Sequence, residues 1–314
     1  MIQRIRRKLN SILSAPQIIR DRLDIIQQAL GRIEARQTAA VPPGDFESSE
    51  FKVSSQWRED GIIEHLVRHV PIERDIFVEF GVQDYSEANT RFLLTHRNWS
   101  GLVIDGSLDN VDRIRQDSIY WRFNLKSECA FITRDNIDSI ISRHGIAGDI
   151  GILSIDIDGN DYWVWKAIDS ISPRIVIAEY NALFGPHAAV SVPYDQDFVR
   201  DRAHYSNLYW GCSLAALESL GKQKGYHLVG CNSAGNNAFF VRTDVIGALP
   251  VREPVDAFRA ARFRESRNLD GSLSFLDAEA AFDVIATLPL VQVDVGRQIR
   301  VGDVPRLLRP EAEV

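Results

Sequence analysis

Short apolar runs alternate with helix-length segments from Phe51 to about Asp244, which is typical of an α/β fold. Five runs predict strands buried on both faces of a parallel sheet, at 76–80, 101–105, 119–123, 150–155 and 174–178. Helices are expected beside them, at 62–70, 87–96, 109–116, 135–144, 161–170 and 212–224. Two last runs, 225–230 and 237–242, predict an antiparallel hairpin. We therefore expect an α/β protein with a Rossmann-like, doubly wound sheet that ends in a hairpin.

The beginning of the chain carries an apolar seam that predicts a coiled coil. Ile19, Leu23, Ile26, Leu30 and Ile33 follow alternating steps of three and four, and we call them the N-terminal seam. Leucine at position a and isoleucine at position d favour assemblies larger than dimers. Two alternatives stay open. The helix packs on its own domain, or it lies on a membrane surface, which the basic residues near its start would favour.

The same patterns divide the chain into four parts. Residues 1–40 form the N-terminal coiled-coil helix and 41–50 a linker rich in proline. Residues 51–244 form the α/β domain, and 245–314 form a C-terminal cap or interface extension. We expect the first part to assemble a homo-oligomer.

Composition excludes several classes of protein. The 314 residues carry a formal net charge of -7, which argues against a nucleic-acid binder that neutralises many phosphates. Cys129, Cys212 and Cys231 are odd in number and far apart, so they predict neither a disulfide framework nor a zinc site. No apolar run is long enough to span a bilayer. We expect a cytoplasmic protein, and leave open a peripheral association with the inner membrane through partners.

Acidic residues close the expected strands at the edge where open α/β sheets bind ligands. Glu79 and Gly81 end the first strand, Asp105 and Gly106 end the second, and Asp156 follows the fourth. The loop after the first strand lacks the GxGxxG spacing that brings backbone against a pyrophosphate, which disfavours a dinucleotide. A smaller adenosyl cofactor without phosphates suits it better, with Asp105 accepting both ribose hydroxyls.

These motifs resemble the class I S-adenosylmethionine-dependent methyltransferases over roughly residues 60–243. Leu153-Ser-Ile-Asp-Ile-Asp-Gly-Asn-Asp-Tyr162 and the following Trp163-Val-Trp-Lys-Ala-Ile168 look like the strand-turn-helix of FkbM-type sugar and polyketide methyltransferases. They are also similar to metal-dependent catechol and caffeoyl-coenzyme A O-methyltransferases, in which an acid and an asparagine follow the next strand. Here that second element is Ala178-Glu-Tyr-Asn181, with Glu-x-Asn in place of adjacent Asp-Asn.

The resemblance implies an S-adenosylmethionine cofactor and one divalent cation. The expected cofactor-binding residues are Glu79, Gly81, Asp84, Asp105, Gly106, Asn124 and Asp156. The expected metal ligands are Asp156, Glu179 and Asn181, with Asp158 nearby as a catalytic residue. Oxygen ligands prefer hard cations, so Mg²⁺ is expected first, with Mn²⁺ or Ca²⁺ as alternatives.

The general base is sought in the long loop that carries His187 and His204. Deprotonating a sugar hydroxyl near neutral pH requires a positioned base or a metal that lowers the pKa of the hydroxyl. Both histidines are candidates, and an ordinary surface histidine is the alternative for each. Structural roles also stay open for the acids. Asp158 or Asp161 would cap a helix, and Glu79 would be the buried partner of a backbone amide.

We expect a metal-assisted O-methyltransferase that acts on a carbohydrate or glycan precursor in bacterial polysaccharide or natural-product biosynthesis. The acceptor class follows from the resemblance alone. Arg259, Arg262, Arg264 and Arg267 predict recognition of a phosphate or carboxylate, or else a solvated helix face. The rivals are a metal-dependent hydrolase or sugar-modifying enzyme without S-adenosylmethionine, and a non-catalytic Rossmann-like scaffold of a glycan assembly complex.

Overall fold

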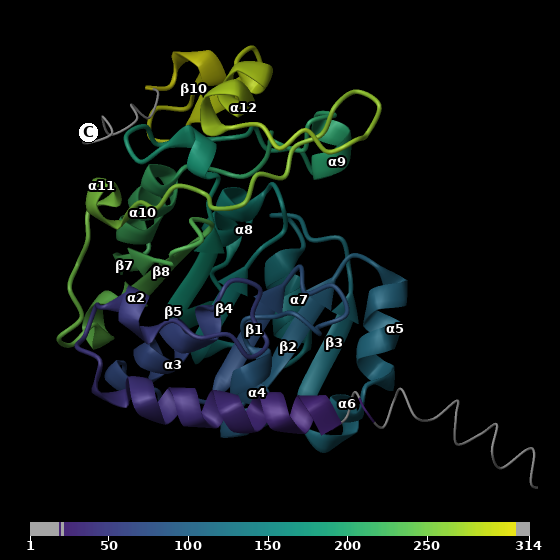
Figure 1. Ribbon diagram of the computed structural model, residues 1–314, viewed down its shortest axis with the longest axis vertical. Coiled ribbons are helices and arrows are strands. Elements are labelled where there is room, and N and C mark those ends of the chain that lie inside the picture. Colours follow the sequence, from purple (N-terminus) through teal and green to yellow (C-terminus); the bar gives the residue numbers. More distant parts are fainter. Residues whose placement is uncertain (1–18, 20–21, 306–314) are drawn as a thin grey trace, which may run out of the picture.

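The computed structural model describes residue 19 and residues 22–305, which fold around a seven-stranded sheet with helices on both faces (Figure 1). Its strands are β1 (Ile76–Phe80), β2 (Ser100–Asp105), β3 (Leu125–Cys129), β4 (Gly148–Ile155), β5 (Ile171–Glu179), β7 (Tyr226–Cys231) and β8 (Asn237–Arg242). The strand order is β3-β2-β1-β4-β5-β8-β7. Strands β1 to β5 pair in parallel, and β8 runs antiparallel to both of its neighbours. The expected Rossmann-like sheet with a terminal hairpin is confirmed.

Two apolar cores hold the helices to the sheet. The α-helices are α2 (Phe46–Ser49), α3 (Glu59–His69), α4 (Arg91–Arg97), α5 (Leu108–Gln116), α6 (Ser118–Arg122), α7 (Ile137–Arg143), α8 (Asp161–Ala167), α9 (Arg200–Ala203), α10 (Leu214–Gln223), α11 (Pro254–Ala257) and α12 (Ala278–Ile285). Short 3₁₀ turns are η1 (Thr38–Ala40), η2 (Ala182–Phe184), η3 (Thr243–Val245) and η4 (Val301–Asp303). Side chains alternate along a strand, so Val78 packs with α7, α8 and α10, whereas Phe77 packs with α3 and α4.

The third strand lies later in the chain than expected. The apolar run at 119–123 falls mostly in α6, whose first turn is capped by the Asp117 side chain, and β3 follows at Leu125–Cys129. Short apolar runs fit a buried helix as well as a strand, which explains the error. Asn124 therefore precedes β3, and its carbonyl accepts a hydrogen bond from Gly101 near the start of β2. It lies at the edge opposite the ligand-binding one, so its expected cofactor role is wrong.

A cap builds on the carboxyl edge of the sheet (Figure 1). It contains a small antiparallel sheet of β6 (Val190–Ser191), β9 (Pro289–Gln292) and β10 (Arg297–Arg300), in the order β10-β9-β6. Phe184 and Tyr209, from the loops after β5, share its core with Phe282 and Ile285 of α12. Much of the segment expected as an appended extension therefore folds together with an insertion of the α/β domain. Residues 306–314 of that segment lie outside the described residues.

The N-terminal helix, helical over 22–37, lies at the end of the molecule opposite the cap (Figure 1). It packs on its own domain: Ala35 joins Phe51, Val53 and Phe92 in a small core, and a Cβ on Gly31 would lie 2.4 Å from Val53 Cγ2. This is the alternative that the sequence left open. The expected linker is partly ordered too, since α2 places Phe46 edge-to-face on Phe239.

The N-terminal seam lies on the other face of this helix and is uncovered. Leu23, Ile26, Leu30 and Ile33 are 59%, 54%, 56% and 44% exposed. Residues 1–18, 20 and 21 lie outside the described residues, so the earlier part of the expected coiled-coil segment is not characterised. Among the described helices, none combines the length and apolarity needed to cross a bilayer.

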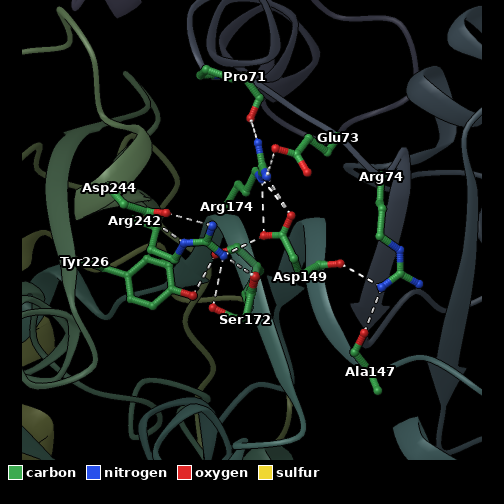
Figure 2. Close-up of polar contacts among 11 residues, drawn as sticks. Pro71, Glu73, Arg74, Ala147, Asp149, Ser172, Arg174, Tyr226, Arg242 and Asp244 are labelled. Carbon is green, nitrogen blue, oxygen red and sulfur yellow. Dashed lines mark hydrogen bonds and ion pairs between the residues drawn. The ribbon is translucent and has the colours of Figure 1, made fainter.

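The amino edge of the sheet is fastened by an ion network at the starts of β4 and β5 (Figure 2). Asp149 accepts hydrogen bonds from Arg174 Nε at 2.9 Å and Arg242 Nη1 at 2.6 Å. Partial burial raises the pKa of Asp149, but the two guanidinium groups outweigh it and lower the pKa overall. Arg242 also donates to Ser172 O, which ties the hairpin to β5. The charged groups of this network are paired with one another, in contrast to the acidic cluster described next.

Candidate active site at the carboxyl edge

Register places the acidic strand ends side by side. Phe80 pairs with Ile104, Glu79 with Ser154, and Ile155 with Ala178. The next residues along each strand therefore meet in one row: Gly81, Asp105, Asp156 and the strand-ending Glu179. All four line a cleft of about 750 Å³. The parallel sheet thus gathers residues that are up to about a hundred positions apart, as the strand-end pattern predicted.

Gly81 lets β1 turn directly against the end of β4. Its φ is +68°, and a Cβ built on it would lie 1.6 Å from the Asp156 carbonyl oxygen. No side chain fits that space. Gly106, which also lines the cleft, is different: its Cβ would find only Phe131 Cδ2, at 3.7 Å. The first glycine is therefore required by the backbone, and the second is not.

Asp105 is fixed in the cleft by three donors. Oδ2 accepts from Gln83 N at 2.8 Å, and Oδ1 accepts from Ser107 N at 2.8 Å and Asn110 Nδ2 at 3.0 Å. A carboxylate has about four acceptor positions, so Oδ2 keeps one for a ligand hydroxyl. The position suits a ribose acceptor, but the side chain has room for one further hydrogen bond where the sequence predicted two.

Glu79 has the structural role that the sequence left open. Its carboxylate accepts from Asn89 N at 2.8 Å, Thr90 N at 3.0 Å and the Thr90 hydroxyl. Burial raises the pKa of Glu79 to about 7, against the opposing effect of these donors. Glu79 thus accepts the hydrogen bonds of backbone amides that would otherwise be free at the start of α4. It lines a small cavity beside the cleft rather than the cleft itself.

Asp84 does not reach either cavity. Its Oδ1 accepts from Ser86 N at 3.1 Å and from the Ser86 hydroxyl, which closes a local turn. The side-chain hydrogen bond from Ser86 lowers the pKa of Asp84, with a smaller opposing effect of burial. The expected cofactor role of Asp84 is therefore wrong, because its carboxylate is bonded within a local turn and lines neither the cleft nor the small cavity beside it.

Three carboxylates converge at the ends of β4 and β5. One oxygen from each of Asp156, Asp158 and Glu179 lies within 4.8 Å of the others. Burial, and then the neighbouring negative charges, raise the pKa values of Asp156 and Glu179 well above their usual range. Glu179 Oε2 is buried without a hydrogen-bond partner. Such a cluster is strongly disfavoured as three bare anions, so it favours a proton or a cation.

Asp161, next to this cluster, is structural. It accepts from Ile157 N and Gly159 N, both at 2.9 Å, and so closes the turn before α8. Burial raises the pKa of Asp161 to about 6, although the two amides lower it. This turn also holds the backbone of Asp158 in the left-handed region, at a φ of +55°. Asp161 shapes the backbone that presents Asp158 to the cleft.

Asn181 does not belong to the acidic cluster, which corrects the expected ligand set. Its Oδ1 accepts from Leu183 N at 3.0 Å and caps η2. Its Nδ2 donates to Leu208 O and Trp210 O, both at 3.0 Å. Both polar atoms of the Asn181 side chain are therefore used in hydrogen bonds that hold the cap. Asp158 is instead the third oxygen-bearing residue of the cluster.

Neither expected histidine reaches the cleft. His187 is exposed in the loop after η2. His204 Nδ1 lies 2.7 Å from the Ser206 hydroxyl, and its ring packs on Tyr205. Within the described residues, no histidine lines the cleft, so the carboxylates are its basic groups. The 184–207 loop does reach the cleft, through Phe198 and Arg200, but other parts of it pack in the cap core and carry the two histidines elsewhere.

Arg200 is the functional residue that sequence reasoning missed. Its Nη1 donates to Asp158 Oδ1 at 2.6 Å, its Nε donates to Asn207 O at 2.9 Å, and its guanidinium lies 4.7 Å from the Trp210 ring centre. The residue follows an irregular loop, and no periodicity or motif marks it. Phe131, at the carboxyl end of β3, also lines the cleft and would follow from correct placement of that strand.

Comparison with known proteins gives similarities of fold only. No family model and no curated protein matches the chain. A solved S-adenosylmethionine-dependent methyltransferase from Clostridium acetobutylicum ATCC 824 is 13% identical, with 59% of this chain and 90% of that chain covered and a TM-score of 0.39. The N-terminal domain of EvdMO1 with SAH bound is 11% identical, with 67% and 94% covered and a TM-score of 0.40. An O-methyltransferase from Bacillus cereus in complex with SAH is 10% identical, with 68% and 88% covered and a TM-score of 0.34.

S-adenosylmethionine-dependent methyltransferases are thus among the solved structures that the chain resembles, as its motifs predicted. Identities and TM-scores this low carry no conclusion about activity. The function proposed next therefore depends on the sheet order and on the chemistry of the cleft.

Proposed function

We propose that the chain is an S-adenosylmethionine-dependent O-methyltransferase that works in the cytoplasm with a divalent cation. Its acceptor would be the hydroxyl of a carbohydrate or glycan precursor in a bacterial polysaccharide or natural-product pathway. One observation carries the proposal. The carboxyl edge of the sheet has an acid suited to a nucleoside ribose, but the backbone amides that could bind phosphates at the start of α4 are not free. Asp105 suits an adenosyl ribose, while Glu79 already accepts from the Asn89 and Thr90 amides at the start of α4.

The charge of the cleft supports the same choice. Its lining includes the acids Asp105, Asp156, Asp158, Glu179, Asp201 and Glu265, and Arg200 pairs with Asp158. The carboxylates would repel a pyrophosphate in this cleft. The N-terminus of α4 could not offset that repulsion, because Glu79 already occupies its amides. S-adenosylmethionine carries a sulfonium and an ammonium group, so its charge is complementary to that of the cleft.

Replacing Asp105 tests the adenosyl assignment. Asp105→Ala removes a charged acceptor for one ribose hydroxyl, so affinity for S-adenosylhomocysteine should fall by about 1.5–3 kcal/mol. Asp109→Ala, in the exposed first turn of α5, is the matched control and should bind as the wild type does. Isothermal titration calorimetry gives both affinities. Equal affinity in the Asp105 variant would remove the ribose from this position.

The small cavity beside Gly81 supports an ammonium-bearing cofactor. It holds about 80 Å³ and is lined by Glu59, Glu79, Asn89 and Asn237 among others. Asn237 Nδ2 donates to Glu59 Oε1 at 2.9 Å, whereas Asn237 Oδ1 is buried without a partner. A buried acceptor without a donor is costly, and a ligand ammonium would satisfy it.

The amino-acid part of the cofactor can be tested by leaving it out. S-adenosylhomocysteine should bind more tightly than 5′-methylthioadenosine, which lacks that part. Asn237→Leu keeps the volume but removes the acceptor, so it should weaken S-adenosylhomocysteine by about 1–3 kcal/mol and leave 5′-methylthioadenosine unchanged. Parallel titrations measure both. If the variant weakens the two ligands equally, the cavity does not hold the ammonium group.

The acidic cluster fits a hard divalent cation. Its donors are oxygens only, and the unpartnered Glu179 Oε2 is available to a ligand. Asp156, Asp158 and Glu179 would hold the ion, which would supply charge that lowers the pKa of the acceptor hydroxyl. Asp158 is the exposed member of the cluster and is held in place by Arg200. We propose that Asp158 accepts the proton of the acceptor hydroxyl.

We further propose that the N-terminal seam joins copies of the chain. An uncovered stripe of leucine and isoleucine at heptad spacing gains free energy when a second helix covers it. Ile26→Glu with Leu30→Glu should lower the mass measured by light scattering, with unchanged affinity for S-adenosylhomocysteine. Ile25→Glu is the control, because Ile25 is 63% exposed on the same helix but lies off the seam. An unchanged mass in the double variant would show that the seam does not join copies.

A further inference from the structure

A second cavity, which we call the side chamber, opens beside the cleft. It holds about 280 Å³ and shares Arg200, Phe263 and Glu265 with the cleft. Asn181 and Asp277 are polar residues of its wall, and the apolar part of the wall includes Leu183, Leu208, Trp210, Leu276 and Ala281. These residues belong to the cap, so the side chamber is not part of the nucleotide-binding sheet. Carbohydrate hydroxyls would find few partners on this apolar part, whereas an apolar group would be desolvated by it.

Arg200 joins the side chamber to the acidic cluster. Its guanidinium lies over Trp210 and donates to Asp158, while Nη2 lies 3.8 Å from Glu265 Oε2. Burial opposes its charge, but Asp158 and Glu179 outweigh that effect and raise the pKa of Arg200. The Arg200 side chain is therefore charged and held in one position between the side chamber and the acidic cluster. A ligand in the side chamber that contacts Arg200 would therefore lie next to the residue that donates to Asp158.

Two further arginines, the exposed Arg262 and Arg264, line the side chamber, whose carboxylates are those of Glu265 and Asp277. Within the described residues, the guanidinium groups of Arg262 and Arg264 make no ion pair and no hydrogen bond to the protein. The half-buried Arg267, by contrast, pairs with Glu265 at 3.4 Å. Both free groups belong to a segment whose backbone is anchored, since Arg262 N donates to Ala234 O at 2.9 Å. Free guanidinium groups beside an apolar cavity attract a phosphate or carboxylate that is attached to an apolar group.

We propose that the side chamber binds the acceptor, and that this acceptor is an anionic amphiphile. Its apolar arm fills the chamber between Trp210, Leu276 and Ala281. Its phosphate or carboxylate pairs with Arg262 and Arg264, and its hydroxyl lies beside Arg200 at the acidic cluster. The inference rests on the proposed function and narrows its acceptor to a carbohydrate or glycan precursor that also carries an apolar group and a phosphate or carboxylate. A bare sugar would leave the apolar wall and the two arginines unused.

Hexyl phosphate is a suitable probe, titrated into the full chain with and without S-adenosylhomocysteine. It should bind, whereas inorganic phosphate and the neutral hexyl glucoside should each bind about tenfold or more weakly. Arg262→Gln with Arg264→Gln should weaken hexyl phosphate by about tenfold or more and leave S-adenosylhomocysteine unchanged. Arg122→Gln, at an exposed arginine of α6, is the control and should change neither. Ala278→Phe, at an exposed position on the chamber wall, should block hexyl phosphate by filling the space.

The outcomes separate this inference from the proposed function. If S-adenosylhomocysteine binds but hexyl phosphate does not, or binds equally to all variants, the side chamber is not an acceptor site and the methyltransferase proposal stands. If inorganic phosphate binds as tightly as hexyl phosphate, the arginines form a simple anion site and the amphiphile is wrong. If hexyl phosphate binds as expected but S-adenosylhomocysteine does not, the chamber binds anionic amphiphiles but the acceptor role falls with the proposed function.

Discussion

Gly81→Ala is expected to abolish measurable binding of S-adenosylhomocysteine and to destabilise the α/β domain. The added Cβ would lie 1.6 Å from the Asp156 carbonyl oxygen, so either β1 or the end of β4 must move. Overpacking of this kind typically costs about 1–3 kcal/mol or more, and a residue with a side chain at a φ of +68° adds strain. Because the displaced backbone carries Asp156 and Gln83, the cofactor site and the acidic cluster change together. Thermal unfolding and calorimetry measure the two losses.

Gly106→Ala is the matched control for this substitution. It adds the same methyl group to the same cleft, but its closest contact would be Phe131 at an ordinary 3.7 Å. We expect wild-type stability and little change in affinity. A Gly81 variant that behaves like the Gly106 variant would show that β1 and β4 do not meet as described.

Glu179→Gln should change thermal stability in opposite directions with and without a divalent cation. Burial and the charges of Asp156 and Asp158 raise the pKa of Glu179, so its ionised form destabilises the cation-free protein. Removing the charge should therefore raise the Tm in EDTA at pH 8. The gain should disappear as the pH falls toward the ordinary range of a glutamate, because the carboxyl is then protonated in both the native and the unfolded wild type.

With Mg²⁺ or Mn²⁺ present, the same variant should lose the stabilisation that the cation gives the wild type. Asp201→Asn is the control, because Asp201 lines the cleft but stands outside the cluster, and it should keep that stabilisation. Differential scanning calorimetry of the three proteins, with and without EDTA, gives all six Tm values. A wild-type Tm that no divalent cation alters would remove the metal from the proposal.

The fold was predictable where the sequence pattern has a single physical meaning. The runs at β1, β4 and β5 are continuously apolar and end in acids, so both the strands and their shared edge follow from the sequence. The run at 119–123 is five residues long and fits a helix equally well, and there the prediction is wrong. That error moved Asn124 to the opposite edge and hid Phe131.

Within the site, residues held by the sheet were easier to predict than residues held by loops. Gly81, Asp105 and Asp156 lie in the cleft because strand register alone places them there. Asn181 and His204 depend on how the cap folds, which in turn depends on contacts with α12 nearly a hundred residues later. No local pattern contains that information. Arg200 is placed by the same cap, so it too follows only from the three-dimensional structure.

Calorimetry of the wild-type chain with S-adenosylhomocysteine tests the central claim most directly. We expect saturable binding of about one ligand per chain, no competition by NAD, and the same site occupied with or without Mg²⁺. A metal-dependent hydrolase, a sugar-modifying enzyme or a non-catalytic scaffold would bind no S-adenosylhomocysteine. Absence of binding by the folded wild-type chain would therefore contradict the methyltransferase assignment, whatever the acidic cluster binds.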